Sequence, residues 1–271
     1  MRIRASVTVG LLATTLLVAG VAVAAAPVAS AGGGPHGPRT PCARTDALFC
    51  EDFEGQPVGG ASSLDWGVDT RHGTLQVERA GRAGKVLHVH TEGNGAAFLE
   101  VPDVAGPGTS FFGRLRVKVD DFPTAPDWAH FTLVEVTGAG SSEVVRPLGG
   151  QFAPTVGPDA TFWGVGADGG PTGDWTSWRE SAPTVEDRWQ CVEFQWDVTE
   201  NRISLWFDGV PQPDLSVTQT EHGGAPVDLV LPSADNVRVG WQLYQGGSTP
   251  DHFDVWIDDI TFAAERVGCG R

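Results

Sequence analysis

Apolar and polar residues alternate along Val237–Gln245, a segment with the sequence VRVGWQLYQ. Side chains of an extended strand point alternately to opposite faces. The apolar members of the segment therefore share one face, which we expect to join the core: Val237, Val239, Trp241 and Leu243. The polar members share the other face: Arg238, Gln242 and Tyr244. Tyr244 is the single tyrosine of a chain with ten tryptophans, which draws attention to its phenol. A hydroxyl bonded at a sheet edge is the structural alternative.

Short strand-like segments of this kind recur along the chain, separated by Gly, Pro, Asn and Asp, and helical periodicity is hard to find. Many short strands with turn signals predict an all-β sandwich or barrel. No linker and no repeat is visible after residue 41, so one domain is expected. The predicted strands are Leu75–Arg79, Val86–Thr91, Phe111–Val119, Phe131–Val136, Thr161–Val165, Trp189–Asp197, Arg202–Phe207, Val237–Tyr244 and Phe253–Phe262.

The first residues have the pattern of a secretory signal peptide. A basic start, MRIR, precedes the small and apolar run Val7–Ala26, and Ala29-Ser30-Ala31 is an A-x-A cleavage signal. We therefore expect residues 1–31 to be removed, 32–46 to form a Gly/Pro-rich N-terminal segment, and 47–271 to form the domain. The expected location is extracellular.

Charge and cysteine content narrow the range of partners. The formal net charge of −16 becomes −18 without Arg2 and Arg4, which disfavours nucleic acid and anionic membrane as partners. We expect a monomer. The four cysteines of an exported chain are expected to form disulfides, and no CxxC pair or Cys/His cluster predicts zinc. The cysteines are Cys42, Cys50, Cys191 and Cys269.

Cationic residues gather on one face of Phe111–Asp120, FFGRLRVKVD. Arg114, Arg116 and Lys118 alternate with apolar residues, so successive cations lie about 7 Å apart along a strand. Arginine suits bidentate recognition of carboxylates, so this row could bind the uronate groups of an acidic polysaccharide. The alternative is an outer strand face neutralised by acids on neighbouring strands.

A second alternating segment, Asp127–Val136, places Trp128, His130 and Thr132 on one face. Histidine is the side chain most easily tuned to accept a proton near neutral pH. His130 next to an aromatic platform is therefore a candidate base. A hydrogen-bonded sheet histidine is the competing explanation.

Tryptophans offer stacking surfaces for sugar rings as well as bulk for the core. Trp175 and Trp178 follow the glycine-rich loop Ala167–Asp174, and we expect these two to contact sugar, whereas tryptophans inside strands are expected in the core.

A glycoside hydrolase would need two carboxylates facing one sugar. Glu193 and Asp197 would lie on the same face of one strand, but Asp197 leads into a turn and is expected to be structural. Glycoside hydrolysis therefore ranks below a lyase activity.

Three motifs carry a family resemblance: ALFCEDFEG, the hairpin W-x-C-V-E…NRISLWFDG, and FDVWIDDITF. With them the chain resembles the concanavalin A-like jelly rolls, sandwiches of two antiparallel sheets. Within these it is most similar to the group of the fungal cellulose-induced protein, its actinobacterial relatives and the glucuronan lyases. The resemblance covers roughly Ala47 to Cys269.

This resemblance implies a secreted polysaccharide lyase that cleaves a uronate-containing polysaccharide by β-elimination. Arg114 or Arg116 with Gln242 would neutralise the uronate carboxylate, His130 would be the base and Tyr244 the acid. Further contacts to the substrate are expected from Lys118, Arg238, Trp128, Trp175 and Trp178. Leu243 stands where the alginate-lyase branch has a tyrosine, so alginate is disfavoured. A non-catalytic carbohydrate-binding protein has the same fold and is the alternative.

The resemblance also implies a structural calcium ion, held by the positions that match Glu54 and Asp258, with Asp52 and Asp259 as further ligands. A shared ion would place the first and last strands side by side and antiparallel, with paired residue numbers that sum to about 312. Cys42 and Cys269 sum to 311, which predicts a Cys42–Cys269 disulfide and leaves Cys50 for Cys191. A local Cys42–Cys50 disulfide is the competing arrangement.

Overall fold

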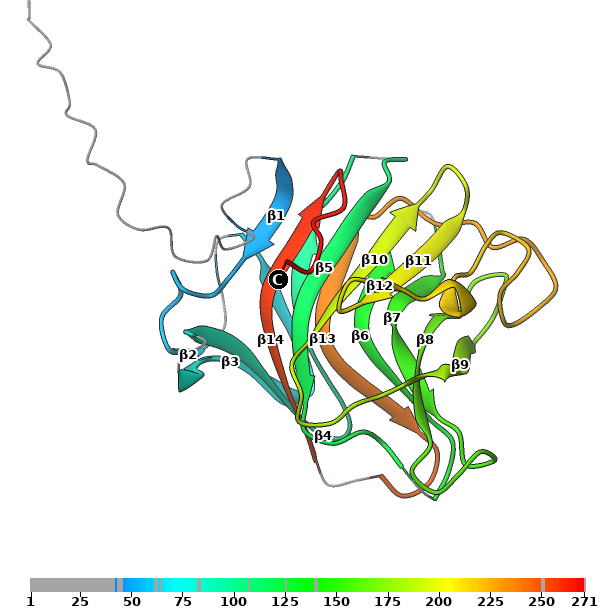
Figure 1. Ribbon diagram of the computed structural model, residues 1–271, viewed down its shortest axis with the longest axis horizontal. Helices are drawn as coiled ribbons and strands as arrows, with labels where there is room; N and C mark the ends of the chain where they lie inside the picture. Colours follow the sequence, from blue (N-terminus) through cyan, green and yellow to red (C-terminus); the bar gives the residue numbers. More distant parts are fainter. Residues whose placement is uncertain are drawn as a thin grey trace, which may run out of the picture. The chain divides into compact units, whose positions relative to one another are not determined.

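Antiparallel strands make up nearly all the regular structure of the computed structural model (Figure 1). It describes Cys42 and residues 46–60, 63, 65–81, 84–106, 108–124, 126–138, 141–249 and 252–270. The expected signal peptide, residues 1–31, and most of the Gly/Pro-rich segment lie outside these residues. No helix in the described ranges is long and apolar enough to span a membrane.

The strands are short, apart from three. They are β1 (Ala47–Glu51), β2 (Gly59–Gly60), β3 (Gly67–Arg79), β4 (Lys85–Pro102), β5 (Phe111–Val119), β6 (Ala129–Thr137), β7 (Val144–Phe152), β8 (Thr161–Asp168), β9 (Trp175–Pro183), β10 (Gln190–Asp197), β11 (Arg202–Phe207), β12 (Val210–Pro211), β13 (Asn236–Gln245) and β14 (His252–Ala263). Each predicted segment overlaps a strand, but β2, β7, β9 and β12 were not predicted, and β4 continues well beyond the predicted end at Thr91. A 3-10 helix, η3, spans Pro213–Leu215.

A single curled sheet forms two facing layers because β4 changes partner along its length. Its first half pairs with β14, from Leu87↔Ile257 to Glu92↔His252, and its second half pairs with β13, from Ala96↔Gln242 to Pro102↔Asn236. The back layer continues from β14 through β5, β10, β11 and β12. The front layer continues from β13 through β6, β7, β8 and β9. This arrangement confirms the predicted all-β jelly roll.

Aromatic side chains fill the space between the layers. Trp163 of β8 contacts Phe207 of β11, with ring centroids 5.6 Å apart, and Trp241 of β13 contacts Phe253 of β14 at 5.3 Å. The apolar face predicted for β13 is in this core, since Val237, Val239, Trp241 and Leu243 are all 0% exposed. Burial of such side chains is the main force that holds the layers together.

The first and last strands lie side by side, as predicted. β1 and β14 are antiparallel, and the pairs Phe49↔Phe262, Cys50↔Thr261 and Glu51↔Ile260 each sum to 311. The disulfide pairing derived from this register is nevertheless wrong. The protein has Cys42–Cys50 and Cys191–Cys269, with Cα atoms 5.3 and 5.8 Å apart.

The reason lies in where the chain goes after β14. The ladder ends at Ala263, and the following segment turns onto β10, where Glu193 is almost fully buried. The Glu193 carboxylate accepts hydrogen bonds from Arg266 Nη2 and the Gly268 amide, each at 2.7 Å. These contacts bring Cys269 to Cys191 of the same strand. Cys42 precedes the ladder and closes the short loop to Cys50.

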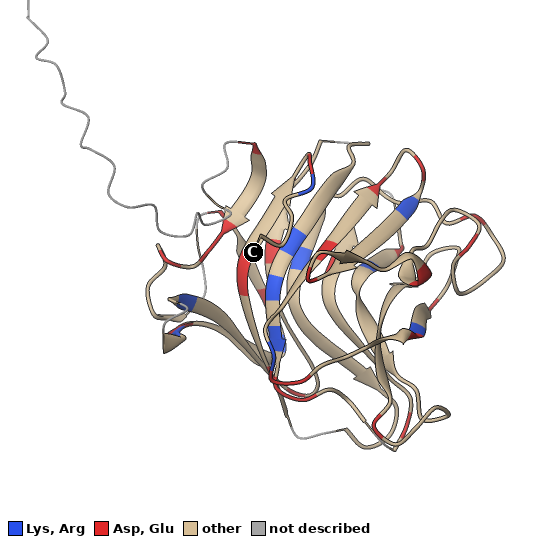
Figure 2. Cartoon of the chain, in the orientation of Figure 1, with Lys and Arg blue, Asp and Glu red and all other residues tan. Residues whose placement is uncertain are grey.

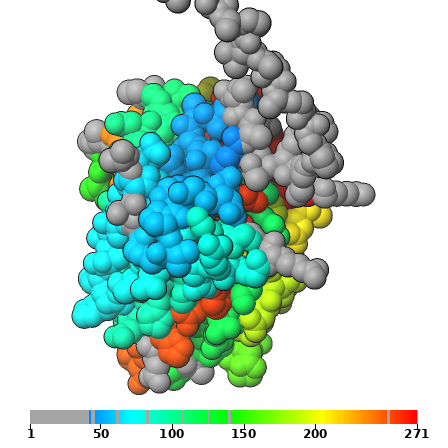
Figure 3. Space-filling view, turned by 90° about the vertical axis from the view of Figure 1, so that its left-hand side faces the viewer, coloured from blue at the N-terminus to red at the C-terminus, as the bar shows by residue number. Residues whose placement is uncertain are grey.

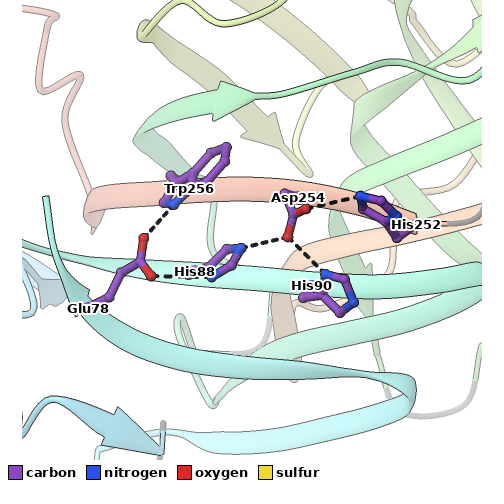
Figure 4. A network of polar contacts seen from close by, with 6 residues as sticks. All are labelled: Glu78, His88, His90, His252, Asp254 and Trp256. Carbon is purple, nitrogen blue, oxygen red and sulfur yellow. Dashed lines mark hydrogen bonds and ion pairs between the residues drawn. The ribbon is translucent and has the colours of Figure 1, made fainter.

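A polar network lies on the outer face of the back layer, across β3, β4 and β14 (Figure 4). Asp254 accepts hydrogen bonds from His88 Nε2 at 2.7 Å and His90 Nδ1 at 2.8 Å. The His88 ring stacks on Trp256 at 5.1 Å, and Trp256 donates to Glu78 of the edge strand β3. The network thus joins three strands, and Figure 3 shows this side of the molecule, with the residues of β3 and β4 in cyan.

Replacing Asp254 by asparagine should destabilise the protein at neutral pH but much less in acid. Burial favours a higher pKa for Asp254, but the hydrogen bonds from His90 and His88 outweigh it and hold the pKa below the ordinary 3.8. A carboxyl with a lowered pKa stabilises the fold above the pKa of the unfolded chain, and this contribution is lost as the pH falls through the lower folded value. We expect a loss of about 1–3 kcal/mol at pH 7.

Urea unfolding at pH 7 and at pH 3 measures this difference. Asp187→Asn is the matched control, because Asp187 makes a single ion pair with Lys118 and its side chain is 70% exposed. An equal loss for Asp254→Asn at both pH values would contradict the role given to the charge.

Candidate functional site

The outer face of the front layer is hollowed into a groove with a cavity of about 310 Å³, a volume within the usual range of ligand sites. Polar side chains from β13, β6 and β7 line it, with Asp168 and Asp174 at the β8–β9 connection. The lining residues used below are His130, Thr132, Arg146, Arg238, Gln242 and Tyr244. We call this hollow the groove.

Strand pairing explains why these side chains meet. β13 and β6 are neighbours in the register Tyr244↔His130 and Arg238↔Glu135, so the polar face of one strand continues onto the other. The sequence placed His130, Gln242, Tyr244 and Arg238 on the polar faces of two separate segments. The structure brings these four residues together in the groove.

Glycines of β7 and β8 lie close to the groove residue Arg146 and to strand β9. Gly149 of β7 pairs with Gly164 of β8, and Gly166 lies opposite Arg146. A Cβ atom at Gly166 would lie 2.5 Å from the Trp175 carbonyl oxygen and 3.1 Å from the Arg146 guanidinium. The missing side chains therefore let β9 approach closely and let Arg146 lie across β8.

His130 is held in a largely buried position. Its Nδ1 atom lies 2.8 Å from Thr176 Oγ1, and its ring centroid lies 6.5 Å from that of Tyr244. Burial, and after it the charge of Arg146, lowers the pKa of His130 below the ordinary 6.5, although Asp174 and Asp168 oppose this change. The imidazole is therefore neutral at pH 7, the form that can accept a proton.

Tyr244 and Gln242 present polar atoms to the groove. The Tyr244 side chain is among the most exposed large ones, with 62% of the residue accessible. Within the described part of the chain, neither the Tyr244 hydroxyl nor the Gln242 amide has a hydrogen-bond partner. Both groups are therefore free to bond a ligand.

Arg146 is a groove residue that the sequence analysis missed. It is only 9% exposed, and its Nη2 atom donates to Asp174 Oδ1 at 2.9 Å and to the carbonyls of Ala167 and Trp175. These bonds tie together the two ends of the β8–β9 loop. The signal was present as one cation inside the otherwise uncharged segment VVRPLGGQF.

Arg238 lies in the groove but is surrounded by acids. Asp69, Glu100 and Glu135 each form an ion pair with its guanidinium, at 3.4 Å for Glu100 and 2.8 Å for Glu135. Burial raises the pKa of Glu135, against the opposing effect of Arg238. Little positive charge from Arg238 is left for an anionic ligand.

The cationic row of β5 is on the other layer (Figure 2). Arg114 is buried beside Asp259, with Nη1 3.5 Å from Oδ2, and Lys118 pairs with Asp187 and lies over the Trp256 ring. Arg116 lies over the Trp189 ring at 5.6 Å. These three cations do not line the groove, so the structure does not bring them together with His130. The alternative, a strand face balanced by neighbouring acids, describes most of this row.

The three tryptophans predicted to contact sugar differ in their exposure and packing. Trp128 is 42% exposed and directly precedes β6, whereas Trp178 stacks on Phe162 with ring centroids 5.1 Å apart. Trp175 is 5% exposed and donates its indole N–H to Thr172. The prediction for Trp175 is therefore wrong, because β9 begins at this residue and turns its side chain inward.

The carboxylates considered for glycoside hydrolysis have structural roles. Glu193 is 1% exposed and binds the segment after β14. Asp197 Oδ1 accepts hydrogen bonds from the Thr199 and Glu200 amides, so it caps the β10–β11 turn as expected.

The four predicted calcium ligands have other partners. Glu54 accepts from the Lys85 amide at 2.8 Å, and Asp259 pairs with Arg114. Burial, then the charge of Asp259, raises the pKa of Asp258 to about 7, and Asp52 adds to this effect. Nowhere in the described ranges are three His, Cys, Asp or Glu side chains arranged to hold a metal ion. These residues as placed do not fit a shared site, and the calcium ion stays a prediction.

Chelation tests that prediction directly. If calcium binds, EDTA should lower the melting temperature and added calcium should restore it, because an ion that binds only the folded state stabilises it. An unchanged melting temperature would remove the ion from the description of this fold.

The curled antiparallel sheet defines an all-β jelly-roll fold. Among solved structures, the fold is similar to that of a cellulose induced protein, Cip1, with a TM-score of 0.55 and 19% identity over 82% of this chain and 100% of that one. The binding domains of botulinum neurotoxin DC, in complex with SialylT, and of serotype C1 each give a TM-score of 0.49 at 10% identity. They cover 82% of this chain and 48% and 49% of theirs. No family model and no curated protein matches the chain. The likeness to Cip1 confirms the predicted resemblance at the level of fold.

Proposed function

We propose that the protein binds a polysaccharide in the groove and cleaves uronate-containing chains by β-elimination. The observation that carries this proposal is the placement of His130 and Tyr244 as cross-strand neighbours facing one cavity, 6.5 Å apart between ring centroids. A lyase needs a base and an acid close to one sugar residue, and these two side chains supply both.

The proposed reaction uses four side chains. Neutral His130 removes the proton from the carbon next to the uronate carboxylate, and the electron pair forms a carbon–carbon double bond as the bond to the glycosidic oxygen breaks. The Tyr244 hydroxyl gives its proton to that leaving oxygen. Arg146 and Gln242 offset the charge that develops on the carboxylate, a contribution that grows in the transition state.

Arg146 takes the role that the sequence analysis gave to Arg114 or Arg116. Its guanidinium influences His130 directly, since its charge lowers the pKa of the imidazole. It is also held in place by two carbonyls and Asp174, which reduces the reorganisation needed when substrate binds.

Non-catalytic carbohydrate binding is the second candidate. It is favoured by the three acids around Arg238, which lower the attraction of this end of the groove for anionic sugars. Exposed Tyr244 and Trp128 would then stack against sugar rings. The fold shared with a cellulose induced protein supports a polysaccharide ligand under either candidate.

A panel of glucuronan, alginate, pectate and glucuronoxylan, with cellulose as the neutral control, separates the two candidates. We expect the ultraviolet absorbance of an unsaturated uronate to appear with at least one acidic polymer. The His130→Ala variant should not produce it. If no polymer is cleaved but one retards the protein in an affinity gel, the protein is a binder and not a lyase.

A further inference from the structure

Thr176 is the one described residue that hydrogen-bonds the His130 ring. It lies on β9, while His130 lies on β6, and two strands separate them in the sheet order (Figure 1). On the two strands between them, Gly149 of β7 pairs with Gly164 of β8. The bond therefore links two strands that are not neighbours in the sheet.

The rotamer of Thr176 is restricted by packing. A Cβ atom at Gly164 would lie 3.0 Å from Thr176 Cγ2, so the methyl group occupies the space left by this glycine. A β-branched side chain has few χ1 choices. With the methyl group against Gly164, the hydroxyl is directed to His130 Nδ1.

The direction of this hydrogen bond decides whether His130 can act as a base. A neutral imidazole carries one N–H. If Nδ1–H donates to Thr176 Oγ1, then Nε2 has the free lone pair and can take a proton from the substrate. If the hydroxyl donates instead, Nε2 carries the proton and is not basic. Nε2 has no partner in the described part of the chain, so it is the nitrogen open to a ligand.

We infer that Thr176 is a positioning residue for His130: it accepts a hydrogen bond from Nδ1–H, fixes the ring and leaves the Nε2 lone pair directed to substrate. This inference rests on the proposed function for its catalytic meaning, but the tautomer itself does not depend on activity. Thr176 does not touch the reacting atoms in this scheme.

The test compares Thr176→Val, which keeps the branched shape and removes the hydroxyl, with Thr176→Ser, which keeps the hydroxyl. The first readout is the ¹⁵N NMR spectrum of the His130 ring, recorded without substrate from pH 5 to 8. We expect the Nδ1–H tautomer in the native protein and in Thr176→Ser. In Thr176→Val we expect a shift toward the Nε2–H form, which a free histidine side chain prefers. Ser177→Ala, at the next position of β9, should leave the His130 signals unchanged.

The second readout is kinetic, on whichever polymer of the panel is cleaved. Thr176→Val should lower kcat by about tenfold with little change in KM, because ring position affects the chemical step more than binding. Thr176→Ser should retain most of kcat, a rescue that loss of packing alone would not give.

The two hypotheses fail in different ways. An Nε2–H tautomer in the native protein, or identical His130 spectra in the native protein and Thr176→Val, overturns the positioning role whatever the activity. If Thr176→Val does not fold, the native and Thr176→Ser spectra still decide the tautomer. An Nδ1–H tautomer without cleavage of any polymer supports the positioning role and rejects the lyase.

Discussion

Replacing Tyr244 by phenylalanine should lower kcat for polysaccharide cleavage by at least about a hundredfold. The ring and its contact with His130 remain, and only the proton donor is lost. The hydroxyl has no hydrogen-bond partner in the described part of the protein, and the residue is 62% exposed, so the variant should be as stable as the native protein. Initial rates and a thermal melt measure the two effects separately.

Trp128→Ala is the contrasting variant. Trp128 is an exposed aromatic residue that directly precedes the strand of His130, and its indole N–H is too weak an acid to protonate a leaving oxygen. Its loss should raise KM and leave kcat nearly unchanged. Full activity of Tyr244→Phe would remove Tyr244 from the mechanism and require another acid in the groove.

Replacing Trp241 by alanine should cost about 3–5 kcal/mol of the free energy of unfolding. Trp241 is 0% exposed, and its ring stacks on Phe131 at 5.2 Å with an interplanar angle of 14°. It also contacts Phe253 of the back layer at 5.3 Å. The cavity left behind would therefore lie where the two layers meet, under the strand that carries Gln242 and Tyr244.

Urea unfolding of Trp241→Ala and Trp241→Phe measures this effect. Within the described residues, Trp241 Nε1 is buried without a hydrogen-bond partner. Phenylalanine therefore removes a polar atom that gains nothing from burial, and it should cost clearly less than alanine. A loss below about 1 kcal/mol for alanine would show that the layers repack around this position.

Alternation along single strands was enough to predict much of this protein. It placed Trp241 in the core and its neighbours Arg238, Gln242 and Tyr244 on the opposite face, because the period of two is set by local backbone geometry. It predicted the cationic face of β5 equally well. What alternation does not contain is the order of strands in space, so it could not tell that β5 and β13 belong to different layers.

Long-range pairing also decided the disulfides. The residue numbers paired between β1 and β14 were predicted to sum to about 312 and sum to 311, yet Cys42 and Cys269 lie beyond the ladder. Their pairing follows from the hydrogen bonds that Glu193 makes with the chain after β14, and no local pattern in the sequence indicates such a contact. Arg146 was missed for a similar reason, since its role depends on the loop that it closes.

The long strand β4 pairs with strands of both layers, so its register is shared by the two layers. Leu87 and Val89 face the core where it pairs with β14, while Leu99 pairs with Val239 of β13 further along. A slip of one residue turns every side chain of a strand to the other face. Such a slip in β4 would turn His88 and His90 into the core where β4 pairs with β14. It would also expose apolar side chains of β4 along both of its halves. The pairing of β4 with β14, outside the groove, therefore also fixes the register of β13, which carries groove residues.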